Sequence, residues 1–227
     1  MVPRIIHRQW YGPREMPERY RENGELWLQL NPGWELIDHD YTTLPPLRND
    51  WEFSEVGKSW MPKRGDGKEA SLIQVTQADI AAYEILYSFG GLYVNCDMRP
   101  IRPLPDHLQQ QDITLAYEID GSLISNAFMM SVPQHPLINA VIEALPESVK
   151  HPDRGVDYVT GPRLLTRIAE SFHGIDILPA RFCNPWLPTH QKVTHEDTIC
   201  VHEWGHATKD EDLWADKPRQ AGEQRYF

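Results

Sequence analysis

One segment, residues 78–97, constrains the fold of this chain more than any other part of the sequence. It closes a longer stretch in which apolar residues recur every three or four positions, which predicts a helix of about five turns. The residues that follow this spacing are Leu72, Val75, Ala78, Ala82, Ile85, Leu86 and Phe89. Gly90-Gly91 predicts the end of the helix, and the apolar residues 92–94 predict a short buried strand directly after it.

The predicted strand ends in Asn95-Cys96-Asp97, two oxygen-bearing side chains separated by one residue. If the chain stays extended, Asn95 and Asp97 lie on the same face, because side chains alternate along a strand. A carboxylate and an amide aimed together can hold a hard divalent cation or a sugar hydroxyl. The alternative is an ordinary turn, in which the pattern Asn-x-Asp is common.

The first forty residues predict a strand, a helix and a second strand. Residues 2–10 predict a first buried strand, closed by Tyr11-Gly12-Pro13, and Pro17 precedes a helical pattern over Glu18–Leu30. Asn31-Pro32-Gly33 ends that pattern, and residues 34–37 predict the next strand. This β-α-β order is typical of a parallel sheet with crossover helices.

The rest of the chain continues the alternation of strands and helices. Residues 41–67 are rich in proline and predict an irregular segment. Further strands are expected at 113–117, 127–132, 175–178 and 198–202, and helices at 137–145 and 161–172. No repeat or linker divides the sequence, so we expect residues 1–227 to form a single α/β domain.

Charge and composition exclude several classes of partner. A formal net charge of -11 argues against nonspecific binding to nucleic acid or anionic membranes, which need basic patches. No run approaches the roughly 20 apolar residues of a membrane span, and charged side chains interrupt the N-terminus. The three cysteines lack metal-binding spacing. We therefore expect free thiols and a cytoplasmic location.

Several short motifs follow one another along the chain. They are Val2-Pro3-Arg4-Ile5-Ile6-His7 with Trp10, Asn31-Pro32-Gly33-Trp34-Glu35, Ala78-Asp79, Tyr83-Glu84-Ile85-Leu86-Tyr87, Gly90-Gly91 with Tyr93, Ser125-Asn126-Ala127-Phe128, His135-Pro136, and Gly161-Pro162 with Thr166. In order and spacing, this series resembles glycosyltransferase family 32, the DXD-containing sugar transferases. Their relatives include yeast-type initiating mannosyltransferases and, more distantly, the large clostridial glucosylating toxins.

The resemblance implies a fold, a reaction and a cofactor. The implied fold is the GT-A type nucleotide-sugar-binding fold, with a mostly parallel central sheet flanked by helices. The implied reaction moves a sugar, with retention of configuration, from a nucleotide-sugar donor to a carbohydrate, lipid or protein acceptor. Mn²⁺ or Mg²⁺ is the implied cofactor, since a divalent ion stabilises the negative charge on the departing diphosphate.

The family motifs assign roles to particular residues of this chain. Trp10 is expected to stack on the nucleobase, Asp79 to bind the hydroxyls of the donor sugar, and Tyr93 and Asn95 to contact the donor. Asp97 is expected to bind the metal ion directly. Without the resemblance, Asp79 would be read as a helix carboxylate facing water, and Tyr93 as a packed strand aromatic.

Catalytic roles are expected further along the chain. Asp97 and Asn126 are the expected catalytic residues. By its place in the motif series Asn126 is expected near the anomeric carbon, with Glu118 and Asp120 in the preceding loop as alternatives. A late family motif matches His202 and Trp204, which predicts His202 as a neighbour of the metal or diphosphate, and His206 as its substitute. The plain alternative is a pair of surface histidines.

Two positions depart from the family pattern. Ala82 stands where the family has an arginine, and Asn95 stands where it has the first aspartate of the DXD motif. Each change removes a polar contact worth about 1–3 kcal/mol. Arg99, Arg102 and Lys63 are candidates for a substitute cation. These departures keep a second hypothesis open, in which the chain binds a nucleotide sugar with weakened or no catalysis.

A third hypothesis comes from the motif H-E-x-x-H at His202-Glu203 and His206. On a helix, the two histidines would share one face and bind Zn²⁺, with Glu203 as the general base of a metallopeptidase. No third ligand follows at the extended spacing of such enzymes, and the β-branched residues before His202 favour a strand.

Overall fold

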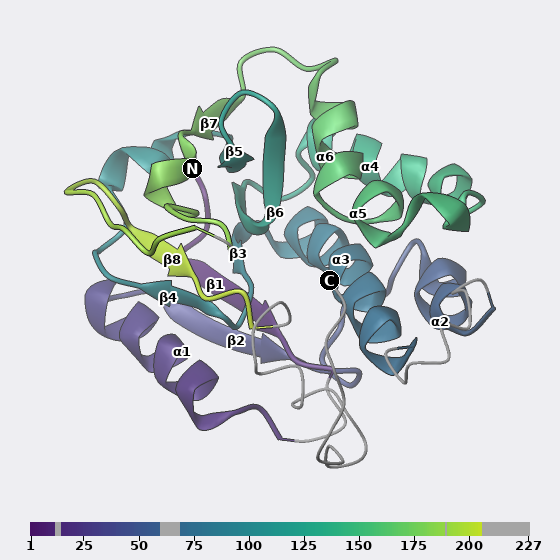
Figure 1. Cartoon of the computed structure of the whole chain (residues 1–227), viewed down its shortest axis with the longest axis horizontal. Coiled ribbons are helices and arrows are strands. Elements are labelled where there is room, and N and C mark those ends of the chain that lie inside the picture. The colour runs from purple at the N-terminus through teal and green to yellow at the C-terminus, as the bar shows by residue number, and fades with distance from the viewer. Residues whose placement is uncertain (12–14, 60–68, 189, 206–227) are drawn as a thin grey trace.

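The computed structural model describes residues 1–11, 15–59, 69–188 and 190–205 (Figure 1). Within these residues, six strands form the central sheet in the order β2-β1-β3-β6-β5-β7. The strands are β1 (Ile5–Gln9), β2 (Glu35–His39), β3 (Gly91–Val94), β5 (Ile113–Ile119), β6 (Leu123–Ser131) and β7 (Asp176–Leu178). All of them run in one direction except β6, which is antiparallel to β3 and β5.

Helices cover both faces of this sheet, as Figure 1 shows: α1 lies on one side, and α3 with α4, α5 and α6 on the other. The helices of the described chain are α1 (Glu18–Leu30), α2 (Asp50–Ser59), α3 (Glu69–Phe89), α4 (Pro136–Ser148), α5 (Val156–Val159) and α6 (Pro162–Ala169). A two-stranded antiparallel sheet of β4 (Met98–Pro100) and β8 (Cys200–His202) packs beside α1.

Strand alternation divides the core into two layers. Tyr93 and Met129 face the layer that holds α3, α4 and α6, whereas Leu92 and Phe128 face the layer that holds Trp27 of α1. Side chains of both strands therefore alternate between the two layers, as the pleat requires. The middle of α3 is buried on all sides between the sheet and α4, which explains why its residues 80–86 are nearly all apolar.

The glycine pair between α3 and β3 allows a close approach of two backbones. Gly91 has φ +96°, and a Cβ atom there would lie 2.6 Å from the carbonyl oxygen of Ile5 in β1. Gly90 has φ +63°, and a Cβ atom would lie 2.7 Å from the backbone nitrogen of Pro133. Only glycine fits both the conformation and the space, so this turn fixes where β3 enters the sheet.

The structure confirms the expected α/β architecture, with a mostly parallel sheet between helices. The helix Glu18–Leu30 and the β-α-β order of the first forty residues are also confirmed. The prediction that residues 41–67 are irregular is wrong, because α2 occupies Asp50–Ser59. None of the described helices is both long and apolar enough to cross a membrane. Nothing in the fold tests the single-domain assignment for residues 1–227, which stays a prediction.

Candidate active site

Polar side chains gather at one edge of the sheet. The carboxyl ends of β1, β3 and β5 lie there, and β6 begins there because it runs the opposite way. This is the edge at which open α/β sheets bind ligands. The sequence-predicted residues at or near these strand ends are Trp10, Asn95, Asp97, Glu118 and Asn126.

Asp79 reaches this edge from α3 and is held by two donors. Asn126 Nδ2 donates to Asp79 Oδ1 across 2.7 Å, and Thr160 Oγ1 donates to Asp79 Oδ2 across 2.8 Å. A Cβ atom on Gly161 would approach Asp79 Oδ2 to 3.3 Å, so the backbone also packs close. The structure therefore brings together Asp79 and Asn126, which the sequence placed in separate roles, and adds Thr160.

Burial raises the pKa of Asp79 to about 7, because the charged carboxylate loses hydration. The hydrogen bonds from Thr160 and Asn126 act in the opposite direction, and the nearby charge of Asp157 raises the pKa further. The Asp79 carboxyl thus changes its charge near neutral pH, which is common for groups in functional sites. It is not the water-facing helix carboxylate of the plain interpretation.

Tyr93 belongs to a chain of buried hydrogen bonds. Tyr11 donates to Gln9 Oε1 across 2.7 Å, Gln9 Nε2 donates to the Tyr93 hydroxyl across 3.0 Å, and Tyr93 donates to Asn95 Oδ1 across 3.1 Å. The Tyr93 side chain is only 3% exposed, so the hydrogen bond that orients the Asn95 side chain comes from the protein interior. Sequence reasoning missed Gln9, although its place at the end of β1 was a usable signal.

The idea that Asn95 and Asp97 share one face of an extended strand is wrong. β3 ends at Val94, and Met98 N donates to the Asn95 carbonyl oxygen across 2.9 Å, so residues 95–98 form a turn. The side chains have different partners: Asn95 accepts from Tyr93, and Asp97 Oδ2 accepts from Gly205 N across 2.8 Å. The turn interpretation weighed from the sequence is the right one for the backbone.

Asp97 and His202 face one another across two segments far apart in the sequence. His202 Nε2 lies 3.3 Å from Asp97 Oδ1, and both side chains are buried. Within the described chain, neither ring nitrogen of His202 has a hydrogen-bond partner, although burying such a group is costly. The His202 ring stacks on Trp204 at 3.9 Å between centroids. His202 is therefore not the surface histidine of the plain alternative.

An unpaired imidazole nitrogen beside a carboxylate oxygen suits a shared divalent ion. Among the described residues no group of three His, Cys, Asp or Glu side chains could hold a metal. This incomplete set still fits Mg²⁺ or Mn²⁺, since Mg²⁺ is usually held by one or two carboxylates and fills the rest of its shell with water and phosphate oxygens. Asp97 and His202 are thus the residues that would hold such an ion.

Glu118 is an additional acid near this edge. Burial raises the pKa of Glu118, the charge of His202 lowers it, and that of Asp157 raises it. Glu118 is thus electrostatically coupled to both His202 and the surroundings of Asp79. Asp120, its alternative, accepts a hydrogen bond from Ala180 N across 2.6 Å and holds a loop instead.

The remaining expected residues have varied surroundings. The partly buried Trp10 ring meets Tyr20 edge-on at 6.0 Å between centroids, just beyond β1. Ala82 is completely buried in the core. Arg102 donates to the Thr198 carbonyl oxygen across 2.7 Å and Arg99 is exposed on β4, so neither is seen to replace the missing arginine. Lys63 and His206 lie outside the described residues.

The peptidase motif lacks the helix it needs. His202 is the last residue of β8, Val201 pairs with Arg99 of β4, and Trp204 has φ +57°. Residues 200–204 therefore do not form the helix on which the two histidines of the motif would have to lie. The zinc-peptidase hypothesis is therefore not favoured.

Comparison with known proteins relates part of the chain to one family. Residues 17–114, which contain Asp79, Tyr93 and Asp97, match the family described as "Glycosyltransferase sugar-binding region containing DXD motif". Over these residues the chain is similar to the DXD-type glycosyltransferases. This confirms the resemblance drawn from the motifs.

Two yeast proteins illustrate the relationship to DXD-type glycosyltransferases. Inositol phosphoceramide mannosyltransferase 3 of Schizosaccharomyces pombe is 28% identical over 189 residues, covering 78% of this chain and 50% of the relative. Mannosyl phosphorylinositol ceramide synthase SUR1 of Saccharomyces cerevisiae is 29% identical over 185 residues, covering 76% of this chain and 43% of the relative. The chain thus spans half or less of each relative's length.

A solved structure supports the fold. The PaToxG glycosyltransferase superposes with a TM-score of 0.53 at 15% sequence identity, over 74% of this chain and 68% of that chain. At this identity the likeness concerns the fold alone, and it confirms the GT-A type expected for a DXD-type relative.

Proposed function

We propose that this chain is a metal-dependent, retaining glycosyltransferase that moves a sugar from a nucleotide-sugar donor to a carbohydrate, lipid or protein acceptor. The observation that carries the proposal is the meeting of two pairs at one sheet edge: Asp97 with His202, and Asp79 with Asn126. The first pair suits a metal-bound diphosphate, and the second suits sugar hydroxyls.

The proposed donor lies along the strand ends. Trp10 at the end of β1 would stack on the nucleobase, since an aromatic ring offers a flat apolar surface. Asp97 and His202, beyond β3, would face the diphosphate. Asp79 and Asn126, at the start of β6, would bind the sugar, with Asp79 accepting from hydroxyls and Asn126 fixing its orientation. This order follows the sheet order β1-β3-β6.

Asp97 and His202 would hold Mn²⁺ or Mg²⁺. Such an ion, when bound, stabilises the negative charge that develops on the leaving diphosphate. The protein supplies a buried, preorganised carboxylate for it, because Gly205 N already fixes Asp97 Oδ2. Asn95, locked by Tyr93, adds a neutral acceptor beside the site.

Retention requires the acceptor to attack from the face that the leaving group departs from, or a second displacement. Asn126 is an amide and a poor nucleophile, so we propose same-face attack with the leaving phosphate oxygen taking the acceptor proton. Burial raises the pKa of Glu118, so this carboxyl is a weaker acid than an exposed glutamate. Asn126 would position the anomeric carbon.

A weakened sugar-nucleotide-binding protein is the second candidate function. Asn95 provides no charge where the family has an aspartate, and the buried Ala82 provides no cation. Both losses reduce transition-state stabilisation more than they reduce shape complementarity, so binding without turnover is the expected signature of this candidate.

A thermal-shift screen of UDP-, GDP- and dTDP-sugars, each with and without Mn²⁺, tests the proposal. One donor should stabilise the fold by about 2–4 kcal/mol at roughly 100–1,000 times its dissociation constant, and only when Mn²⁺ is present. Hydrolysis of that donor then separates the transferase from the binding protein. Absence of any shift across the panel contradicts both candidates.

A further inference from the structure

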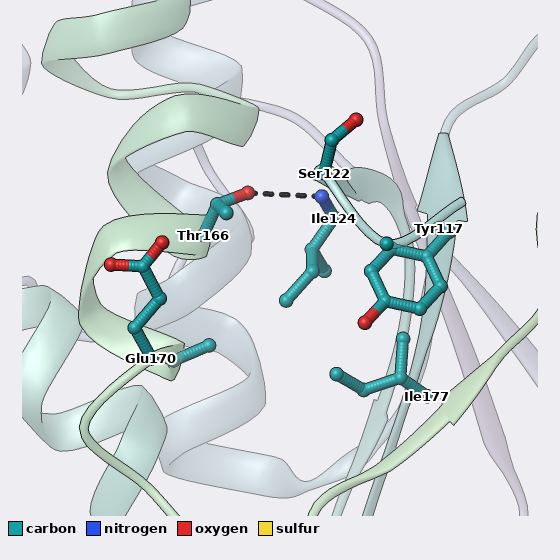
Figure 2. A pocket seen from close by; sticks show the side chains of 8 residues that line it. Tyr117, Ser122, Ile124, Thr166, Glu170 and Ile177 are labelled. Atoms are coloured by element: carbon teal, nitrogen blue, oxygen red, sulfur yellow. Dashed lines mark hydrogen bonds between the residues drawn. The ribbon is translucent and has the colours of Figure 1, made fainter. Parts of the chain in front are cut away.

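A cavity of about 140 Å³ opens between the β5–β6 hairpin, α6 and β7 (Figure 2). The residues that define it include Tyr117, Ser122, Ile124, Thr166, Glu170 and Ile177. No residue of the proposed donor site lines it. A volume of this size exceeds the roughly 10–15 Å³ that one water needs, so the cavity has room for several waters or one small ring.

The cavity continues the line of the proposed donor. That line runs from β1 through β3 to the start of β6, and the next strands in the sheet are β5 and β7, which line the cavity. Ile124 precedes Asn126 by two residues on β6, so the two side chains share a face about 7 Å apart. A group in the cavity therefore lies beyond the sugar end of the donor, where an acceptor must approach.

The lining combines an aromatic ring with hydroxyl-binding groups. Figure 2 shows the Tyr117 hydroxyl pointing toward the space between Ile177 and Glu170. Thr166 Oγ1 is already engaged, since it accepts from Ile124 N across 2.9 Å and donates to the Pro162 carbonyl oxygen across 2.7 Å. The groups left for a ligand are the Tyr117 phenol, the Glu170 carboxylate and the Ser122 hydroxyl, which donates to the Ile119 carbonyl oxygen across 3.3 Å and can still accept.

Charge decides which ligand suits this cavity. None of the residues lining it is Lys or Arg, and Glu170 contributes a negative charge. The nearby Arg167 is directed elsewhere: its guanidinium lies 3.6 Å from the centroid of the Tyr158 ring and donates to the Tyr158 carbonyl oxygen across 3.0 Å. A phosphate-bearing group would thus meet repulsion without a compensating cation, whereas a neutral ring with hydroxyls would meet acceptors and a donor.

We propose that this cavity is the acceptor subsite, and that it takes the sugar ring of a neutral glycan. The inference rests on the proposed transferase function, because it names the second substrate of the same site. The inference predicts that the acceptor of this chain carries no phosphate at the end that reacts.

Two conservative variants test the subsite. Tyr117→Phe keeps the ring and removes the phenol, and Glu170→Gln keeps the shape and removes the charge. Transfer to mannobiose, cellobiose and inositol monophosphate is measured alongside donor hydrolysis without acceptor. We expect the KM for the preferred neutral disaccharide to rise about three- to tenfold in each variant, while donor hydrolysis stays unchanged. Glu22→Gln, an exposed change on α1, should alter neither.

The outcomes separate this inference from the proposed function. Unchanged acceptor KM in both variants, or a preference for inositol monophosphate over the neutral sugars, overturns the subsite while leaving the transferase in place. Absence of both transfer and donor hydrolysis in the unmodified protein overturns the transferase instead. The subsite is then tested by saturation-transfer NMR with the same disaccharides, in which loss of the signal in Tyr117→Phe supports the cavity and an unchanged signal rejects it.

Discussion

The amide of Asn126 donates to the carboxylate of Asp79 across 2.7 Å, and this bond joins the start of β6 to the middle of α3. The two residues are far apart in the sequence, yet together with Thr160 they form one hydrogen-bonded group. In the proposed function this group binds the sugar of the nucleotide-sugar donor. Its three members should therefore respond to mutation as a unit.

Removing either side chain that donates a hydrogen bond to Asp79 should weaken catalysis. Asn126→Ala and Thr160→Val each remove a hydrogen bond to one oxygen of the Asp79 carboxylate. We therefore expect kcat/KM for the nucleotide sugar to fall about tenfold to a hundredfold, or roughly 1–3 kcal/mol. Thr160→Ser keeps the hydroxyl and should retain most of the activity. In the double variant the losses should be less than additive. Fully additive losses, or an inactive Thr160→Ser, would contradict a shared role through Asp79.

Donor binding should depend on pH through Asp79. Its pKa of about 7 means that the carboxylate forms only as pH rises past neutrality. The KM for the donor should therefore fall as pH rises through about 7, and Asp79→Asn should flatten this dependence. Initial rates in buffers between pH 5.5 and 8.5 give the test. A wild-type profile without a step in this window would show that Asp79 does not govern binding.

The same carboxyl should make the fold less stable as pH rises, although it makes donor binding tighter. Because folding raises its pKa above the ordinary value of 3.8, the folded state holds an extra proton between about pH 4 and 7. The free energy of unfolding should therefore decline with rising pH across this window. In Asp79→Asn the free energy of unfolding should fall by about 2 kcal/mol less between pH 5 and 8 than in the unmodified protein, as measured by urea unfolding. Asp106→Asn, an exposed change, serves as the control and should keep the full decline.

Restoring the family arginine should harm the protein. Ala82 has no exposed surface and packs in the core with Tyr83 and Ile85. Ala82→Arg would bury a charge and overfill the core, which costs about 3 kcal/mol or more. We expect a clear loss of Tm by calorimetry, against little change for Gln29→Arg on the exposed part of α1. A stable Ala82→Arg protein with higher donor turnover would show that an arginine at this position can reach the proposed donor site, and would contradict this prediction.

The Glu203 carboxylate distinguishes the transferase from a zinc peptidase. A peptidase needs Glu203 as its general base, whereas here Glu203 lies 3.5 Å from Asn23 Nδ2 and its backbone nitrogen donates to Asp97 O. Glu203→Gln should leave donor hydrolysis within about twofold of the unmodified protein. A loss of donor hydrolysis comparable to that of a metal-ligand variant would place Glu203 in the transferase site and contradict this prediction.

The sequence predicted the strongly periodic parts of the fold well. The helix Glu18–Leu30, the helix that ends at Phe89 and the glycine turn into β3 all have local signals: an apolar repeat, a proline start and a glycine stop. It missed α2 at Asp50–Ser59, where neighbouring prolines suggested a loop, and it missed the short strand β4. Tertiary pairing with β8, rather than local propensity, explains β4.

The candidate site was predicted residue by residue but not as an arrangement. Motif position indicated Asp79, Asn126, Asp97 and His202, yet no local rule told which of them would touch. Thr160 carried no such signal, because a threonine before a glycine is common, and Gln9 had only its place at the end of β1. The antiparallel direction of β6, which brings Asn126 to the same edge as Asp97, came only with the fold. The cytoplasmic location stays a prediction.

The identity of the metal-holding residues is the central claim, and Asp97 tests it most directly. Donor hydrolysis is measured against Mn²⁺ concentration for the unmodified protein, Asp97→Ala and the control Asp106→Asn, each checked for folding by Tm. Loss of the Mn²⁺-dependent rate by about a hundredfold or more in Asp97→Ala, with the control unaffected, is the predicted result. A folded Asp97→Ala protein that keeps its Mn²⁺-dependent donor turnover would contradict the account.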